Sequence, residues 1–262
     1  MAHRQLFQAA VALVGLWGSA CANTSDAGTA AKTCSSGQDL TGASYDLSKS
    51  RFAFGSSPVR EDDSGLVRWV GSQGVVAIAP NGSAMAVPNG DSPALASPPL
   101  SLDAATIKAH TLAYFAAMGV TDCQVQDVST SAGFTGTSVT SLVASLVRGI
   151  DSIAVSESQA WAAFTVDDQT TSESFFWPSI SAAVVSAAVA FRNQLNDPQQ
   201  LAVYKSRLPE TARGEGSVAI HHSPPDSSSA IVKAIVTYDV LSGQSPLSFD
   251  ASGTLVSMPF DP

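Results

Sequence analysis

Three β-prone runs separated by two polar turns lie between Ser138 and Trp177, and this pattern constrains the fold more than any other. The runs cover Ser138–Arg148, Ile153–Val166 and Thr171–Trp177. Asp and Ser occupy the turns between them, where short polar side chains form hydrogen bonds with the nearby backbone. The segment therefore predicts a three-stranded antiparallel meander.

Two features of this meander are candidates for function: the acidic pair Asp167–Asp168 and the aromatic residue Trp161. The two aspartates stand where a turn needs them, so turn chemistry explains them better than a proton-transfer dyad. Successive strand residues point to opposite faces, so Gln159 and Ala163 are expected to share the face of Trp161. Nearby alanines favour core packing of Trp161 against a helix, and a partner anchor on an open face is the alternative.

A second meander is predicted upstream of the first. Its β-prone runs are Leu66–Val70, Val75–Ala79 and Met85–Val87, and glycine-containing turns separate them. The segment Asn89–Ser101 is rich in proline and irregular, so it is expected to form a boundary or a crossover.

The clearest helix follows this segment, with Ser101 or Asp103 as its cap and Gly119 at its end. His110 lies within it, and a lone histidine there is more often structural than a ligand. Residues at helical spacing predict its buried face: Ile107, Tyr114, Phe115 and Met118.

Two more helices and a final set of strands are predicted in the C-terminal third. Asp197 and Pro198 form a favoured cap and first position for the second of these helices. The apolar stripes of the two helices are Val184, Ala188, Phe191 and Leu195, and then Leu201, Tyr204 and Leu208. Strands follow at Gly216–His222 and Ala230–Val240, and then a hairpin turned at Asp250–Gly253. This order of elements predicts an α+β fold in which helices pack on one face of an antiparallel sheet.

The first 21 residues have the features of a bacterial export signal. Arg4 precedes the apolar run Leu6–Trp17, and small residues follow. The pair Ala20-Cys21 resembles the lipoprotein signal, in which the cysteine carries the lipid, and this predicts anchoring in the bacterial outer membrane. Ordinary cleavage, which gives a soluble periplasmic or secreted protein, is the alternative. Residues 22–40 are expected to form a flexible tether. Residues 41–262 form the globular region, either as one body or as a meander (41–100) and a helix-on-sheet module (101–262).

Cysteine usage agrees with export. Cys21 is lipidated or removed under either form of cleavage, which leaves Cys34 and Cys123 in an oxidising compartment. We expect a disulfide between them, and two free thiols are the alternative. Closing a loop of roughly 90 residues contributes about 4 kcal/mol if the geometry is unstrained.

Charge excludes one class of partner. Without residues 1–20 the chain has 12 basic and 22 acidic residues, a net charge of −10. No basic stripe is present, so nucleic acid is not an expected partner and the membrane is reached by the lipid anchor alone.

The segment LVRGIDSIAVSESQAWAAFTVDDQT resembles the core of PepSY and thermolysin-propeptide (FTP) modules. Gly149-Ile150 matches the centre of the first family turn, and Asp167 matches the start of the second. Arg148 and Asp168 depart from the pattern, since the family has aspartate and glycine there. The resemblance covers about residues 102–177. It implies a cystatin-like helix-on-sheet fold and a role in inhibiting or chaperoning a protease, although no metalloprotease domain follows in this chain.

The sequence contains no G-x-S-x-G elbow, H-E-x-x-H helix or phosphate-binding glycine loop. The adjacent pair His221-His222 is the densest imidazole site, but neighbours on a strand point to opposite faces, so no metal or cofactor is expected. A non-catalytic protein- or peptide-binding module is the first hypothesis. A hydrolase or metal-dependent enzyme that uses His221 and His222 is the alternative. The candidate binding residues are Arg148, Trp161, Trp177, His221 and His222.

Overall fold

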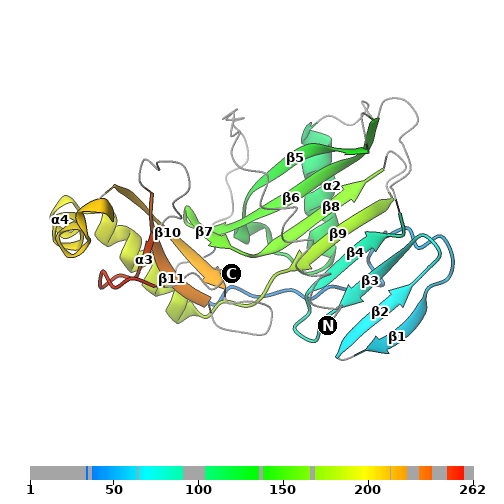
Figure 1. Cartoon of the computed structure of the whole chain (residues 1–262), viewed down its shortest axis with the longest axis horizontal. Helices are drawn as coiled ribbons and strands as arrows, with labels where there is room; N and C mark the ends of the chain where they lie inside the picture. Colours follow the sequence, from blue (N-terminus) through cyan, green and yellow to red (C-terminus); the bar gives the residue numbers. More distant parts are fainter. Residues whose placement is uncertain are drawn as a thin grey trace. The chain divides into compact units, whose positions relative to one another are not determined.

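The computed structural model describes residues 34, 37–63, 65–90, 104–135, 138–165, 169–212, 214–222, 230–237 and 247–256 (Figure 1). These residues belong to one compact unit. The helices are α2 (Ala104–Ala117), α3 (Ala182–Asn196) and α4 (Pro198–Arg207), with two short 3-10 turns, η1 (Asp122–Gln124) and η2 (Glu210–Ala212). The strands are β1 (Val59–Asp63), β2 (Leu66–Val70), β3 (Gly74–Ile78), β4 (Ala84–Pro88), β5 (Val125–Thr135), β6 (Ser138–Ile150), β7 (Ile153–Ser156), β8 (Gln159–Phe164), β9 (Thr170–Phe176), β10 (Glu215–His222), β11 (Ala230–Thr237) and β12 (Leu247–Phe249).

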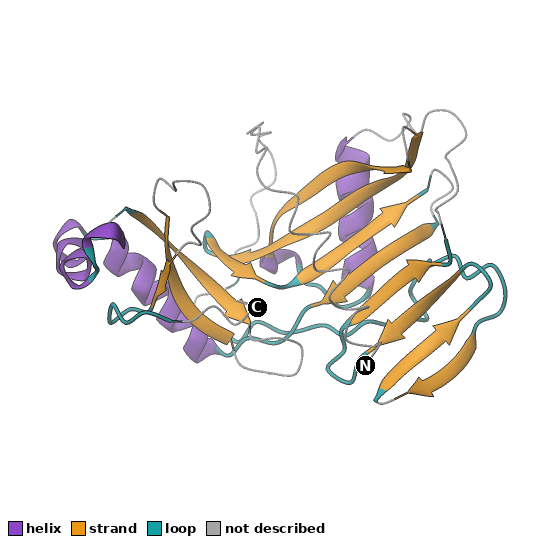
Figure 2. Ribbon diagram, viewed as in Figure 1, coloured by secondary structure: helices purple, strands orange, loops and turns teal. Residues whose placement is uncertain are grey.

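The described strands form one branched sheet that is mostly antiparallel. Their order is β1-β2-β3-β4-β9-β8-β6-β7-β10-β11-β12, and β5 pairs with β6 on a side branch. Only the pairing of β7 with β10 is parallel among the described ladders. Figure 2 shows that α2 crosses the strands of one branch, while α3 lies beside β10 and β11 of the other. The fold is therefore α+β, as the order of elements predicted.

The larger hydrophobic core lies between α2 and the face of the sheet that it covers. The helix contributes its predicted stripe, and all four members are buried: Ile107, Tyr114, Phe115 and Met118. Alternate residues of the strands meet this stripe, among them Ala144, Ala160, Ala162, Phe164 and Phe175. Small alanines at the centre allow the helix to approach the sheet closely. Gly119 ends the helix with φ of +103°, a left-handed conformation that favours glycine.

The sheet forks at Glu157, and this corrects the predicted run Ile153–Val166. β6 ends in a tight turn whose central residues, Asp151 and Ser152, have φ of 53° and 66°. β7 then returns for a few residues and pairs with both β6 and β10. At Glu157 φ is 65° and the chain bends. β8 follows and pairs with both β6 and β9. One predicted strand is thus two strands in different branches.

Two smaller cores stabilise the branch that contains β7, β10, β11 and β12. Ile150, Ile153, Ile220 and the α3 residues Val185 and Ala188 form one of them. The other joins α3 and α4 to the outer strands through Phe191, Tyr204, Leu208, Ala234 and Phe249. Asp197 caps α4 by accepting hydrogen bonds from the backbone N–H groups of Gln199 and Gln200 at 2.8 and 3.2 Å, as the sequence predicted.

The segment 37–54 runs beside β9 and its continuation and is part of the folded body. Leu40 is buried and forms a bridge with Ile180, and Phe52 is buried beside Thr170. The Sγ atoms of Cys34 and Cys123 lie 2.01 Å apart, so the start of this segment adjoins η1.

Other predictions agree with the structure or fall outside it. The upstream meander corresponds to β2, β3 and β4. The turn at Asp250–Gly253 lies between Phe249 and Leu255, which form an antiparallel bridge. β1 was missed because its sequence, VREDD, is mostly charged. Ser101, Asp103 and the pair Asp167–Asp168 lie outside the described residues. No helix in the described part of the chain is both long and apolar enough to span a bilayer.

Candidate binding surface

The face of the sheet opposite α2 carries one continuous row of paired residues across eight strands. From β1 to β5 the row consists of Glu61, Arg68, Ala77, Met85, Ser174, Trp161, Ser145 and Ser129. Directly paired residues point to the same face, so these side chains form a single line. α2 packs on the other face of these strands, and its Lys108 reaches Asp127 at the border of this one. We call this side of the sheet the open face.

Trp161 lies near the middle of the row and is only partly buried. Its neighbours Gln159 and Ala163 share its face, whereas Ala160, Ala162 and Phe164 point into the α2 core, as expected. The first expectation for Trp161, packing in that core, is wrong. The alanines that suggested a helix contact do make one, but they make it on the opposite face of the strand.

The open face is mostly uncharged between its two borders. Next to the central row lie Val75 and Val87, which pair across β3 and β4, and Val143 and Ala163, which pair across β6 and β8. On the other side Phe176 pairs with Gln159. Val147, which pairs with Asp127 on β5, is 39% exposed. Apolar side chains therefore alternate with serines and one glutamine over the strands from β3 to β6.

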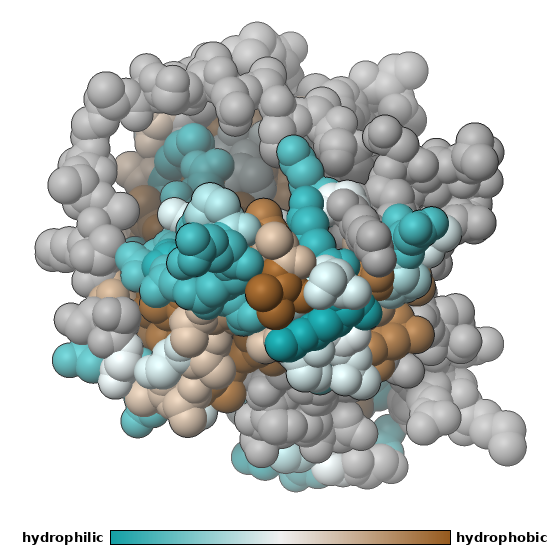
Figure 3. Space-filling model, turned by 90° about the vertical axis from the view of Figure 1, so that its left-hand side faces the viewer, coloured by the Kyte–Doolittle hydropathy of each residue, from teal (hydrophilic) through white to brown (hydrophobic). Residues whose placement is uncertain are grey.

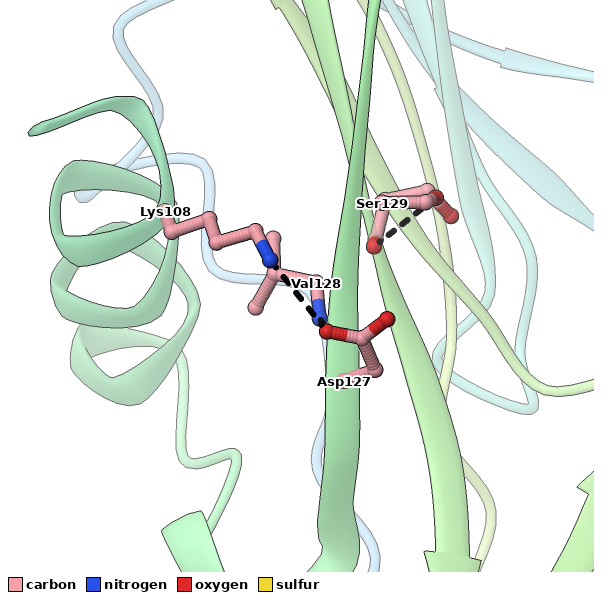
Figure 4. Close-up of polar contacts among 5 residues, drawn as sticks. Lys108, Asp127, Val128 and Ser129 are labelled. Carbon is pink, nitrogen blue, oxygen red and sulfur yellow. Dashed lines mark hydrogen bonds and ion pairs between the residues drawn. The ribbon is translucent and has the colours of Figure 1, made fainter. Parts of the chain in front are cut away.

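Two serines of the open face have hydrogen-bond partners within the sheet. The Ser174 hydroxyl donates to Gln159 Oε1 at 2.9 Å, and the Ser129 hydroxyl donates to the Ser145 carbonyl at 3.4 Å. Figure 4 shows the Ser129 contact together with the border of the sheet. There Lys108 of α2 reaches Asp127 Oδ1 at 3.5 Å, and the same oxygen accepts the N–H of Val128 at 2.7 Å.

Arg148 and Trp177, two candidate binding residues, meet inside the protein. Each is 1% exposed, and the guanidinium carbon lies 4.7 Å from the centre of the indole ring. Arg148 donates to Gln124 Oε1, the Ser158 hydroxyl and the Pro178 carbonyl. Burial lowers the pKa of Arg148 to about 9. Neither residue can contact a partner in this conformation, so their role is internal.

A buried carboxylate that the sequence reasoning missed lies beneath α2. Glu173 is 1% exposed, and hydroxyl groups from three segments donate to it: Tyr45 at 2.5 Å, Tyr114 at 2.6 Å and Ser50 at 2.7 Å. Burial raises the pKa of Glu173, although the three hydroxyl donors act in the opposite direction. Burial and the neighbouring carboxylate also raise the pKa values of Tyr45 and Tyr114. The cluster joins the sheet, the helix and the N-terminal segment.

His221 pairs with Glu157 at the fork of the sheet. The distance from His221 Nδ1 to Glu157 Oε1 is 2.8 Å, and His221 is 2% exposed. Its Nε2 atom is buried and has no hydrogen-bond partner among the described residues. The side chain of His222 is outside the described part of the structure. The structure thus places one of the two predicted histidines beside a carboxylate.

Other surfaces and side-chain clusters of the described residues are weaker candidates for a functional site. In the part of the chain that the structure describes, no group of three or more His, Cys, Asp and Glu residues could hold a metal ion. The end that carries α4 mixes hydrophobic and hydrophilic residues (Figure 3), with Val203 as an exposed apolar side chain. The open face is therefore the most extended candidate surface in the described residues.

Comparisons with known proteins found no relatives. No family model matches the chain, and searches of curated proteins and of solved structures gave no match.

Proposed function

We propose that this chain is a non-catalytic module of the bacterial cell envelope that binds a protein or peptide partner on its open face. One observation carries the proposal: Trp161 stands partly exposed near the centre of a long row of paired residues, on the face opposite α2. Tryptophan is among the residues most enriched at the energetic centres of protein interfaces. Its serine neighbours in the row, Ser145 and Ser174, are much smaller than an indole.

The resemblance to PepSY and FTP modules supports an inhibitor-like or chaperone-like role. We place a cystatin-like arrangement within residues 102–177 as part of the proposal. The support is that α2 packs across antiparallel strands that follow it in the chain, including β5 and β6. A module of this kind acts by contact with another protein and needs no cofactor.

Export and a lipid on Cys21 complete the proposal, because they put the module in the compartment where such a partner is met. The supporting features are the apolar run before Ala20-Cys21 and the polar segment after it.

Site-directed photo-cross-linking in intact cells tests the binding surface. A photoreactive residue at Ser129, an exposed member of the row, is expected to form a specific adduct with a partner. The matched control is Ser206, which is exposed on α4 and distant in sequence. An adduct from Ser206 but not from Ser129 contradicts the proposed surface.

A histidine-centred activity is the second candidate function. The Glu157 carboxylate accepts a hydrogen bond from His221 Nδ1–H, and this fixes the tautomer in which Nε2 carries a lone pair. Such a nitrogen is a general base in many hydrolases. In this conformation Nε2 is buried, so a substrate reaches it only if the fork opens.

Ester and peptide hydrolysis by the purified mature protein tests this second candidate. An activity that disappears in His221→Gln and in Glu157→Gln, with the unfolding midpoint unchanged, favours it. The same activity in both variants excludes His221 as its base.

A further inference from the structure

The charges of the open face lie at its two borders. Glu61 and Arg68, on β1 and β2, form an ion pair at 3.5 Å at one end of the central row. At the other border Lys108 and Asp127 pair at 3.5 Å. Between them, the row consists only of Ala77, Met85, Ser174, Trp161, Ser145 and Ser129. In a chain with net charge −9, this uncharged stretch is a distinct surface.

Among the described residues, this face of β3, β4, β9, β8 and β6 offers no counter-charge to a charged group of a partner. Removing an ion from water without pairing it costs several kcal/mol. In the flanking rows Val75, Val87, Val143 and Phe176 are apolar, and the charge of Asp127 lies at the β5 border. The surface therefore selects against Lys, Arg, Asp and Glu at the positions of the partner that cover Trp161.

Two serines of the face do not require polar atoms from a partner. Ser174 and Ser129 donate their hydroxyl hydrogens to acceptors within the sheet, at 2.9 and 3.4 Å. Ser174 is already buried within the protein, and a partner that covers the exposed Ser129 with apolar groups leaves both hydrogen bonds in place. Apolar burial is then the main source of affinity, and it is not screened by salt.

The borders argue against a membrane surface as the occupant. Glu61 and Asp127 are acidic groups at opposite ends of the face, and the paired Arg68 and Lys108 balance rather than exceed them. Attachment to anionic headgroups requires an excess of basic residues. A protein segment has no such requirement.

We infer that the open face recognises an uncharged, apolar polypeptide segment, with Trp161 at the centre of the contact. The inference rests on the proposed binding function and names the chemistry of its partner. The charge pattern of the row carries it: a neutral partner segment complements a neutral surface bounded by ion pairs.

Fluorescence anisotropy with three labelled peptides of equal length tests the inference. The first peptide alternates Leu and Ser, and the other two carry Lys or Glu at the central Leu positions. We expect the Leu/Ser peptide to bind the mature protein, with an affinity that changes less than about twofold between about 50 and 500 mM NaCl. The Lys and Glu peptides should bind at least about tenfold more weakly.

The variant Trp161→Ala distinguishes a failure of the binding surface from a failure of the uncharged-partner inference. It should weaken binding of the Leu/Ser peptide at least about tenfold, whereas the control Val203→Ala on α4 should leave that binding unchanged. If charged peptides bind as well as the neutral one and Trp161→Ala still abolishes binding, the surface stands and the neutral class is wrong. If no peptide binds, or if Trp161→Ala changes nothing, the binding surface itself is refuted. Tighter binding to vesicles of anionic lipid than to any peptide would assign the face to a membrane instead.

Discussion

Arg148 and Trp177 share a single acceptor inside the protein: Gln124 Oε1 accepts the Arg148 Nε–H at 3.0 Å and the Trp177 Nε1–H at 3.2 Å. The Gln124 amide in turn donates to the Thr41 carbonyl at 2.8 Å. One side chain of η1 thus links β6, the residue after β9 and the N-terminal segment. The charge of Arg148 is held by neutral acceptors and by the face of the indole ring, and no ion pair with a described carboxylate accompanies it.

Arg148→Lys should lower the free energy of unfolding by about 2–3 kcal/mol. Lysine cannot reproduce the planar fork that reaches Gln124, Ser158 and Pro178 together, and it leaves a buried ammonium in a site shaped for a guanidinium. Urea unfolding measures the change. The control is Arg68→Lys at the partly exposed pair with Glu61, where we expect less than about 0.5 kcal/mol. Equal losses in the two variants would show that the Arg148 site is not specific.

Glu173 should make stability depend on pH in a defined direction. Burial raises its pKa in the folded state, so the folded protein holds this proton more tightly than the unfolded chain. Its contribution to stability is present below the unfolded pKa and is lost as pH rises through the raised folded pKa. Glu173→Gln stays neutral, so relative to the wild type it should gain stability as pH increases.

Urea unfolding of both proteins from about pH 2 to about pH 8 measures this difference. Asp46→Asn, at an exposed turn where hydrogen bonds with Ser48 lower the pKa, is the control and should show the opposite trend. A difference between wild type and Glu173→Gln that does not vary with pH contradicts the assignment.

Local sequence patterns predicted the elements that are stabilised by residues close to one another in the sequence. The stripe of α2 follows the helical repeat, and the cap of α4 is formed by Asp197 with Pro198 next to it. Both signals lie within a few residues of the structure that they predict. The same holds for the hairpin turn at Asp250–Gly253.

The fork and the buried carboxylate depend on contacts between distant parts of the chain. The polar triplet Ser156–Ser158 interrupts the run Ile153–Val166, but the contact partner of Glu157 at the fork, His221, is 64 residues away. Glu173 lies in TTSESFF and has the sequence pattern of a solvent-facing strand residue. Its donors are 59, 123 and 128 residues away, so only the folded structure shows that it is buried.

A Cys34–Cys123 disulfide should appear in the exported protein. The structure joins the two cysteines, which are 89 residues apart in sequence. Replacing both by serine should lower the free energy of unfolding by about 4 kcal/mol, because the unfolded chain regains the freedom of a long loop. Non-reducing peptide mapping tests the bond directly. Two alkylatable thiols in freshly exported protein contradict it.

Cys21 should carry lipid at the N-terminus of the mature protein. The expectation follows from the apolar run Leu6–Trp17 and from Ala20-Cys21 after it. Mass spectrometry of the mature N-terminus tests it, with Cys21→Ser as the control that should lose the lipid mass. A free N-terminus at Asn23 shows ordinary export.

Trp161→Ala, with stability and cross-linking measured on the same preparation, tests the binding surface most directly. Because Trp161 is partly exposed and outside the core, its loss should lower the free energy of unfolding by less than about 1 kcal/mol. Trp177→Ala, which empties a buried site, should cost about 3–5 kcal/mol. The Ser129 cross-link to the partner should disappear in Trp161→Ala while the fold stays intact. A loss of about 3 kcal/mol with the cross-link retained would instead make Trp161 a packing residue and refute the open face as the binding surface.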